Sequence, residues 1–316
     1  MPLGADGQTK STERDEVIHN IRAISGITAE QGPDDDRLYA GVRAFVDQFD
    51  YWYIRVMREA VTKYRRLLIE RINPFVRRME FEGLTPGPMS TRLVEDYSRR
   101  NFVTAGGWAI EAMARAASVD AQKSPAVGID LQRMDPETGD VHLYVVKSGP
   151  VTRNSDILAA LKRNARQAER LLRQQKGQKG QVLAKYAIAA GKTSSTFEDG
   201  VWRPSSGEFW AEILGVSEEE AVRLILAIAA EAGRLVRQDA GEYVQSLEVL
   251  VAEYIRSPGD PAAVDWEFIG RRTLMKRETW REEDKARHQR ALKALSDASV
   301  QPELSPDEAA QLANDT

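Results

Sequence analysis

The chain has 316 residues, a formal net charge of −4 and no cysteine, and its length suffices for one large domain or two small ones. The lack of cysteine excludes disulfides, thiolate metal sites and cysteine nucleophiles, and three scattered histidines argue against a histidine-rich zinc site. Because no long apolar run predicts a membrane span and no signal-peptide pattern opens the chain, a cytoplasmic protein is expected.

The first hundred residues are predicted to be largely helical. Residues 1–31 are polar at their start and are expected to form a mobile N-terminal segment. Residues 32–100 have apolar side chains at helical spacing, which predicts a helical subdomain, and Pro74 is expected to kink or divide its helices. Residues 83–88 include two prolines and predict a loop.

A helix followed by a β-hairpin is predicted next. Thr104 is expected to cap a helix that carries Glu111. Residues 127–134 alternate between apolar and polar and predict a strand, and residues 141–146 predict a second strand after a turn that contains Pro and Gly. The two strands are therefore expected to pair as a hairpin.

The faces of this hairpin determine which side chains can meet. Because successive strand side chains point to opposite faces, Asp130 and Lys147 are expected to share one face, with Ile129 and Val146 turned the other way into a core. The order of Glu111, Asp130 and Lys147 can bring two acids and one amine to a single point. Metal-assisted phosphodiester hydrolysis needs such a set, because a hard cation binds oxygen ligands and the attacked phosphate needs a positive charge nearby.

The order of these elements is a helix with a Glu, a strand with an Asp, a turn and a strand with a Lys. This order resembles the core of PD-(D/E)XK nucleases, in the form found in type II restriction endonucleases and Holliday-junction resolvases. The sequence Lys-Ser-Gly-Pro at 147–150 and the sequence Ser-Gly-Glu-Phe-Trp at 206–210 favour the restriction endonuclease branch. The resemblance covers roughly residues 104–266 and implies a nuclease core over residues 101–270. The implied fold is α/β: a small mixed β-sheet flanked by helices, with an N-terminal helical subdomain and a C-terminal helical extension.

The resemblance also implies a function. Glu111 and Asp130 would bind Mg²⁺, with Mn²⁺ as a substitute, and Lys147 would orient the attacking water and stabilise charge on the phosphate. The substrate would be double-stranded DNA, cut in restriction or anti-phage defence, where a companion defence-system protein is a further candidate partner. A double-strand cut needs two such sites, so a homodimer is the simple expectation.

One position departs from the family pattern, which has an acid two residues before the lysine. This chain has Val145 there, and an apolar side chain cannot bind a metal. Three alternatives remain open, in this order. The two acids and the backbone carbonyl of Val146 hold the metal; or Asp156 or Glu169 on the following helix replaces the missing acid; or the site is weakened or inactive.

Basic residues gather on the helix predicted after the hairpin. Lys162, Arg166, Arg170 and Arg173 follow one another at steps of four, four and three, which puts them on one helical face. Such a stripe is often only a solvated surface. Beside a metal site, it predicts contacts with the phosphate backbone of a nucleic acid.

The rest of the chain completes the predicted architecture. Residues 181–190 are apolar and fit a buried central strand, and Ser217 begins a capping box before a long helical stretch. Residues 271–316 are expected to form a helical extension that ends in a flexible acidic tail.

Two rival functions remain beside the metal-dependent endonuclease. The main one is a catalytically weakened DNA-binding or assembly subunit on the same fold, with Val145 as the mark of lost chemistry. The other is a helical scaffold protein in which the motif is coincidental.

Overall fold

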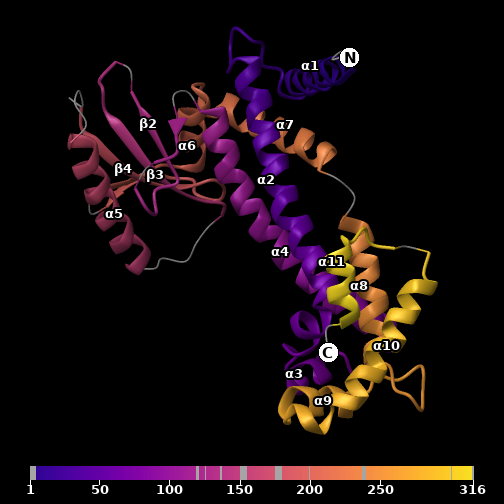
Figure 1. Cartoon of the computed structure of the whole chain (residues 1–316). Helices are drawn as coiled ribbons and strands as arrows, with labels where there is room; N and C mark the ends of the chain where they lie inside the picture. Colours follow the sequence, from indigo (N-terminus) through magenta and orange to yellow (C-terminus); the bar gives the residue numbers. More distant parts are fainter. Residues whose placement is uncertain are drawn as a thin grey trace. The chain divides into compact units, whose positions relative to one another are not determined.

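The computed structural model describes residues 5–118, 121–124, 126–135, 137–149, 155–174, 180–198, 200–236, 240–299 and 301–314. The chain divides into two compact units, one built from residues 1–49 and 106–236 and the other from residues 50–105 and 237–316 (Figure 1). Helices α2 (Asp35–Thr62) and α4 (Pro86–Ala117) each contribute residues to both units. The units are therefore discontinuous in sequence, whereas the sequence pattern predicted four consecutive parts.

The first unit contains an open sheet of six strands in the order β1-β2-β3-β4-β6-β5. The strands are β1 (Ala121–Gln122), β2 (Leu131–Met134), β3 (Val141–Lys147), β4 (Val182–Ile188), β5 (Thr196–Glu198) and β6 (Val201–Arg203). Strands β2 and β3 pair antiparallel as the predicted hairpin. Strand β3 pairs in parallel with β4, after the crossover helix α5 (Ser155–Gln174). The predicted small mixed sheet flanked by helices and its predicted central strand are both confirmed.

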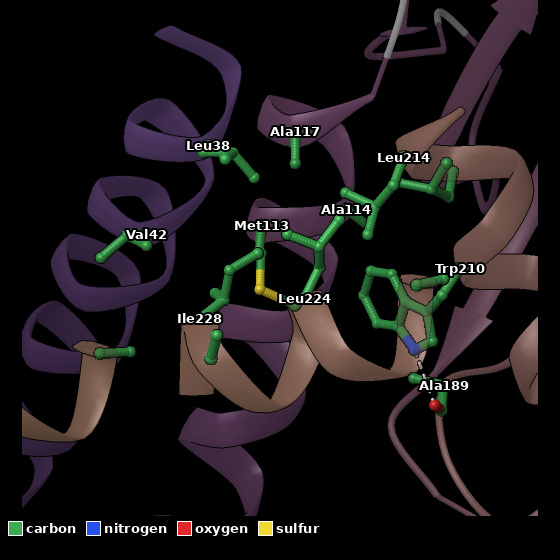
Figure 2. Close-up of a cluster of buried hydrophobic side chains, with 14 of the residues drawn as sticks. Leu38, Val42, Met113, Ala114, Ala117, Ala189, Trp210, Leu214, Leu224 and Ile228 are labelled. Atoms are coloured by element: carbon green, nitrogen blue, oxygen red, sulfur yellow. Dashed lines mark hydrogen bonds between the residues drawn. The ribbon is translucent and has the colours of Figure 1, made fainter. Parts of the chain in front are cut away.

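One face of the sheet is covered by a large apolar cluster. Leu131, Tyr144 and Val146 of the hairpin pack there with α2, α4, α6 (Ser206–Leu214) and α7 (Glu218–Leu235). Figure 2 shows Trp210 of α6 among these side chains, with its indole N–H donating to the Ala189 carbonyl at 2.8 Å. The cluster thus packs the C-terminal part of α4 against the inner strands of the sheet.

The other face of the sheet is covered by α5. Val141, Leu143 and Val145 of β3 pack there with Leu161 and Ala168 of α5. Ile129 belongs to this second cluster, whereas Val146 belongs to the first. Both side chains are buried as predicted, but in separate cores, because Ile129 precedes β2 and does not follow the alternation of the strand.

Helix α4 begins earlier than predicted and runs without a break from Pro86 to Ala117. The prediction that Thr104 caps a new helix is wrong, since Thr104 lies inside α4 and its hydroxyl donates to the Arg100 carbonyl at 3.0 Å. A threonine can satisfy its hydroxyl in this way without ending a helix. Glycines 106 and 107 lie within the same helix.

The second unit is helical in its described residues. Beside parts of α2 and α4 it contains a π-helical turn η1 (Arg65–Ile69), α3 (Pro74–Glu80), α8 (Ala240–Ile255), α9 (Trp266–Leu274), η2 (Arg277–Thr279), α10 (Arg281–Asp297) and α11 (Pro306–Asn314). Asn73 caps α3 and Pro74 is its first residue, so the proline divides the N-terminal helices as predicted.

Both chain ends contain helices where mobile segments were expected. Helix α1 (Ala5–Ser25) buries Val17 and Ile21 against the first cluster, and it packs along α7. At the other end, Leu312 of α11 is buried and its carbonyl oxygen lies 2.8 Å from His288 Nε2. Within the described residues, no helix combines the length and the apolarity that a membrane span needs.

Candidate active site

Asp130 lies directly before β2, and its side chain extends the ladder of the hairpin. Its backbone N–H donates to the Tyr144 carbonyl at 2.9 Å, and its Oδ2 accepts from the Val146 N–H at 2.8 Å. The carboxylate thus replaces a backbone carbonyl at the point where the chain leaves the sheet. This contact holds the Asp130 carboxylate against the Val145–Val146 peptide.

Glu111 of α4 and Asp130 line the same cavity, which has a volume of about 400 Å³. The remaining walls come from α2, α4 and the segment between β1 and β2: Gln48, Trp108, Arg115, Lys123, Ser124, Ala126, Val127, Gly128 and Ile129. The structure therefore brings together the helix acid and the strand acid that the sequence pattern singled out.

The charges at this cavity act on one another. Partial burial and, after it, the negative charge of Asp130 together raise the pKa of Glu111 from its ordinary 4.5 to about 7. The positive charges of Lys147 and Arg115 oppose this rise. Lys147 is the last residue of β3, and its positive charge favours the ionised form of Glu111.

The donor set at the cavity fits a hard divalent cation. Glu111 and Asp130 supply carboxylate oxygens, and the negative charge of Asp130 disfavours the ionisation of Glu111 when no cation is bound. In the described part of the chain, no group of three or more His, Cys, Asp or Glu side chains could hold a metal.

The backbone carbonyl of Val146, the third ligand of the first alternative, belongs to the last part of β3. The N–H and C=O of one strand residue point to the same edge of the strand. Since the Val146 N–H points to Asp130 and the Lys147 carbonyl accepts from Ala189 on the opposite edge, the Val146 carbonyl lies on the edge of β3 that faces β2.

The replacement acids are placed less favourably or lie outside the described side chains. Glu169 is absent from the cavity walls and from the charges that act on Glu111. Asn164 of α5 lies close to Gly128, which lines the cavity. A Cβ atom added to Gly128 would come within 2.3 Å of the side-chain nitrogen of Asn164. The side chain of Asp156 lies outside the residues that the structure describes. Val145 is 7% exposed and belongs to the apolar cluster under α5.

Several cavity residues were not singled out from the sequence. Arg115 and Trp108 lie four residues after and three residues before Glu111 on α4, so helical spacing alone could have identified them. Lys123 and Gln48 reach the cavity from other segments, and no local pattern connects them with Glu111.

The basic residues of α5 form an exposed surface. A hollow of about 680 Å³ runs along the helix and is lined by Lys162, Arg166 and Arg170 of the predicted stripe, together with Arg163. The three arginines are exposed and form no ion pair within the described residues. The side chain of Arg173 is not among those described. This surface offers uncompensated guanidinium groups to an anion.

Residues 55–234 match the family model of the type II restriction endonuclease EcoO109I, which is more than half of the 316-residue chain. The chain belongs to this family. The match includes Glu111, Asp130, Lys147 and the whole of α5, and it confirms the resemblance to restriction endonucleases. At the level of the EcoO109I family, the protein is a DNA endonuclease. A comparison with functionally curated proteins found no match.

The raised pKa of Glu111 predicts a pH-dependent cost in this EcoO109I-family protein. The pKa of Glu111 is about 7 in the folded protein, whereas its ordinary value of 4.5 applies in the unfolded chain. The folded protein therefore loses stability relative to the unfolded chain as pH rises from about 4.5 to about 7. Glu111→Gln should therefore raise the free energy of unfolding by about 1–2 kcal/mol at pH 8, a figure reduced for partial solvent exposure, and by almost nothing at pH 4.

Chemical unfolding at the two pH values without divalent metal measures this difference. Glu95→Gln, which removes an exposed carboxylate from the same helix, is the matched control and should leave the stability unchanged at both. An equal effect of Glu111→Gln at pH 4 and pH 8 would contradict the expected titration.

Proposed function

We propose that this protein is a divalent-metal-dependent endonuclease that hydrolyses phosphodiester bonds of double-stranded DNA, with Mg²⁺ as the metal and Mn²⁺ as a substitute. The observation that carries the proposal is the cavity shared by Glu111 and Asp130, together with the charge of Lys147 acting on Glu111. Membership of the EcoO109I family supports the same reaction class, since such enzymes generally use a divalent metal.

Each residue has a separate task in this proposal. Glu111, Asp130 and the Val146 carbonyl would hold the metal, which supplies Lewis-acid polarisation of the phosphate and a more acidic bound water. The Val146 N–H keeps the Asp130 carboxylate oriented by its 2.8 Å hydrogen bond. Lys147 would orient the attacking water and stabilise the charge that develops on the phosphate oxygens. Glu111 must lose its proton to bind a metal, so binding should improve as pH rises towards 7.

The biological setting follows from the reaction class. We propose a role in restriction or anti-phage defence in the cytoplasm, alone or with a companion defence-system protein. Because cutting both strands needs two sites, the proposed active form is a homodimer.

Plasmid cleavage tests the proposal directly. The purified protein, incubated with plasmid DNA and millimolar Mg²⁺ or Mn²⁺, should produce nicked and linear DNA, and EDTA should prevent both. DNA binding without cleavage under either metal would instead favour a weakened DNA-binding subunit. Val145, an apolar and buried residue at the family's acid position, is the observation that supports this second candidate.

The proposed DNA-contacting surface on α5 makes a separate prediction. If Arg166 and Arg170 contact phosphates, replacing both by alanine should weaken binding to every sequence and reduce the slope of log affinity against log salt by about two, since each lost contact removes about one. Fluorescence anisotropy with labelled duplexes at several salt concentrations measures the slope.

A matched variant removes the same charge elsewhere. Arg281→Ala combined with Lys293→Ala takes two exposed basic residues from α10 and should leave the slope unchanged. An unchanged slope in the α5 variant would mean that the basic stripe is only a solvated helix surface.

A further inference from the structure

A second cavity, of about 560 Å³, lies within the second unit, apart from the residues of the candidate active site. Its walls come from η1 and Glu70 directly after it on one side, and from α9, η2 and the start of α10 on the other. The lining residues are Arg65, Arg66, Glu70, Arg272, Thr273, Met275, Arg277, Trp280 and Asp284. Much of this cavity lies beyond residue 234, where the match to the EcoO109I family model ends.

The floor of the cavity is a buried cluster of charges. Asp284 is 4% exposed and accepts from Arg65 at 2.6 Å, and it forms an ion pair of 2.8 Å with Arg272. Arg272 is 6% exposed, donates to Glu70 at 2.9 Å and lies 4.5 Å from the centre of the Trp280 ring. Its Nε is buried and has no hydrogen-bond partner within the described residues. A guanidinium held in this way is oriented but not fully satisfied.

The mouth of the cavity adds two further positive charges. Arg66 and Arg277 are both exposed and take part in no ion pair among the described residues. With Arg65 and Arg272 they make four guanidinium groups against two carboxylates, those of Glu70 and Asp284. The lining residues therefore carry an excess of two positive charges.

The backbone supports a binding role for these residues. Arg65 and Arg66 lie on a π-helical turn, in which the Glu70 N–H donates to the Arg65 carbonyl at 2.9 Å. Such turns are less stable than α-helix and occur often at functional sites. Here the turn presents two consecutive arginines to one cavity.

We propose that this cavity binds a phosphate monoester, carried either by a free nucleotide or by the end of a DNA strand. A monoester brings close to two negative charges and three acceptor oxygens, which match the excess charge and the converging guanidinium donors. A phosphate inside a DNA strand brings only one charge and has substituents on two of its oxygens, so it matches the excess charge and the guanidinium donors less well.

Calorimetric titration in EDTA tests the proposal without involving the candidate metal site. The native protein should bind deoxyadenosine monophosphate and inorganic phosphate, but neither deoxyadenosine nor the dicarboxylate succinate. Two short oligonucleotides, with and without a 5′-phosphate, then distinguish the sources. A preference for the phosphorylated strand points to DNA ends, and equal binding of the two strands points to a free nucleotide.

Variants tie the binding to the cavity. Arg66→Ala combined with Arg277→Ala changes only exposed residues and should weaken binding of the monophosphate at least tenfold. Arg78→Ala, an exposed arginine of the same unit outside the cavity, should leave it unchanged, and so should Asp130→Ala. The proposal is overturned by a native protein that binds no phosphate-bearing probe, by equal binding of deoxyadenosine, by an unaffected double variant, or by loss of binding in Asp130→Ala.

Discussion

Replacing Asp130 or Lys147 by alanine is expected to abolish metal-dependent DNA cleavage, with a loss of at least about a hundredfold in rate. Asp130→Ala removes one of two acids at the cavity, and Lys147→Ala removes the charge that opposes the protonation of Glu111. The measurement is plasmid cleavage at saturating Mg²⁺, with circular dichroism as a control for folding. Full activity in either variant would remove the proposed site.

Asp130→Asn separates the chemical role of this carboxylate from its structural one. The amide oxygen can still accept from the Val146 N–H, so the variant should be as stable as the native protein. Asp130→Ala leaves that N–H without its acceptor and should cost about 1–2 kcal/mol in the free energy of unfolding. Both variants should be inactive, because neither retains the charge. Activity in Asp130→Asn would mean that this side chain only supports the hairpin.

Val145→Glu is expected to have the second-largest effect, on stability and metal response together. The native side chain is 7% exposed in the cluster under α5, so an ionised Glu there without metal should cost several kcal/mol. Ile129 and Ala126 belong to the same cluster and also line the cavity, so a longer acidic side chain can reach it. Mg²⁺ or Mn²⁺ should therefore raise the melting temperature of Val145→Glu more than that of the native protein.

Leu143→Glu is the matched control for this experiment. Leu143 points to the same face of β3 as Val145 but lies two residues further from Lys147, and its side chain is fully buried. Its replacement should destabilise the protein without any gain from metal. An equal metal response in the native protein and in Val145→Glu would assign Val145 to the core alone. Asp156→Ala and Glu169→Ala, tested in parallel for metal dependence, examine the replacement acids.

The parts of the fold that follow from local pattern could be predicted from the sequence. The hairpin of β2 and β3 follows from alternation on both sides of a turn, and the capping box at Ser217 is present as expected. The central strand β4 follows from an apolar run of strand length. In the candidate site, the juxtaposition of Glu111 and Asp130 required only their order on a helix and a strand.

Features that depend on long-range packing could not be predicted in this way. Thr104 is a good capping residue, yet it lies inside α4, because packing along the whole helix outweighs one local preference. The division into two discontinuous units follows from two long helices that belong to both, and no change in composition marks it. Lys123 reaches the cavity only through tertiary structure.

The hydrogen bond between the Asp130 carboxylate and the Val146 N–H makes the position of this carboxylate depend on the pairing of the hairpin strands. Local opening of strands exposes backbone N–H groups in cooperative segments. Because this carboxylate takes the place of a backbone carbonyl, an opening of the β2–β3 pair also releases it. Substitutions at the distant turn, where Asp135 accepts from the Glu137 N–H at 2.9 Å, could thus lower the population of the assembled site without touching it.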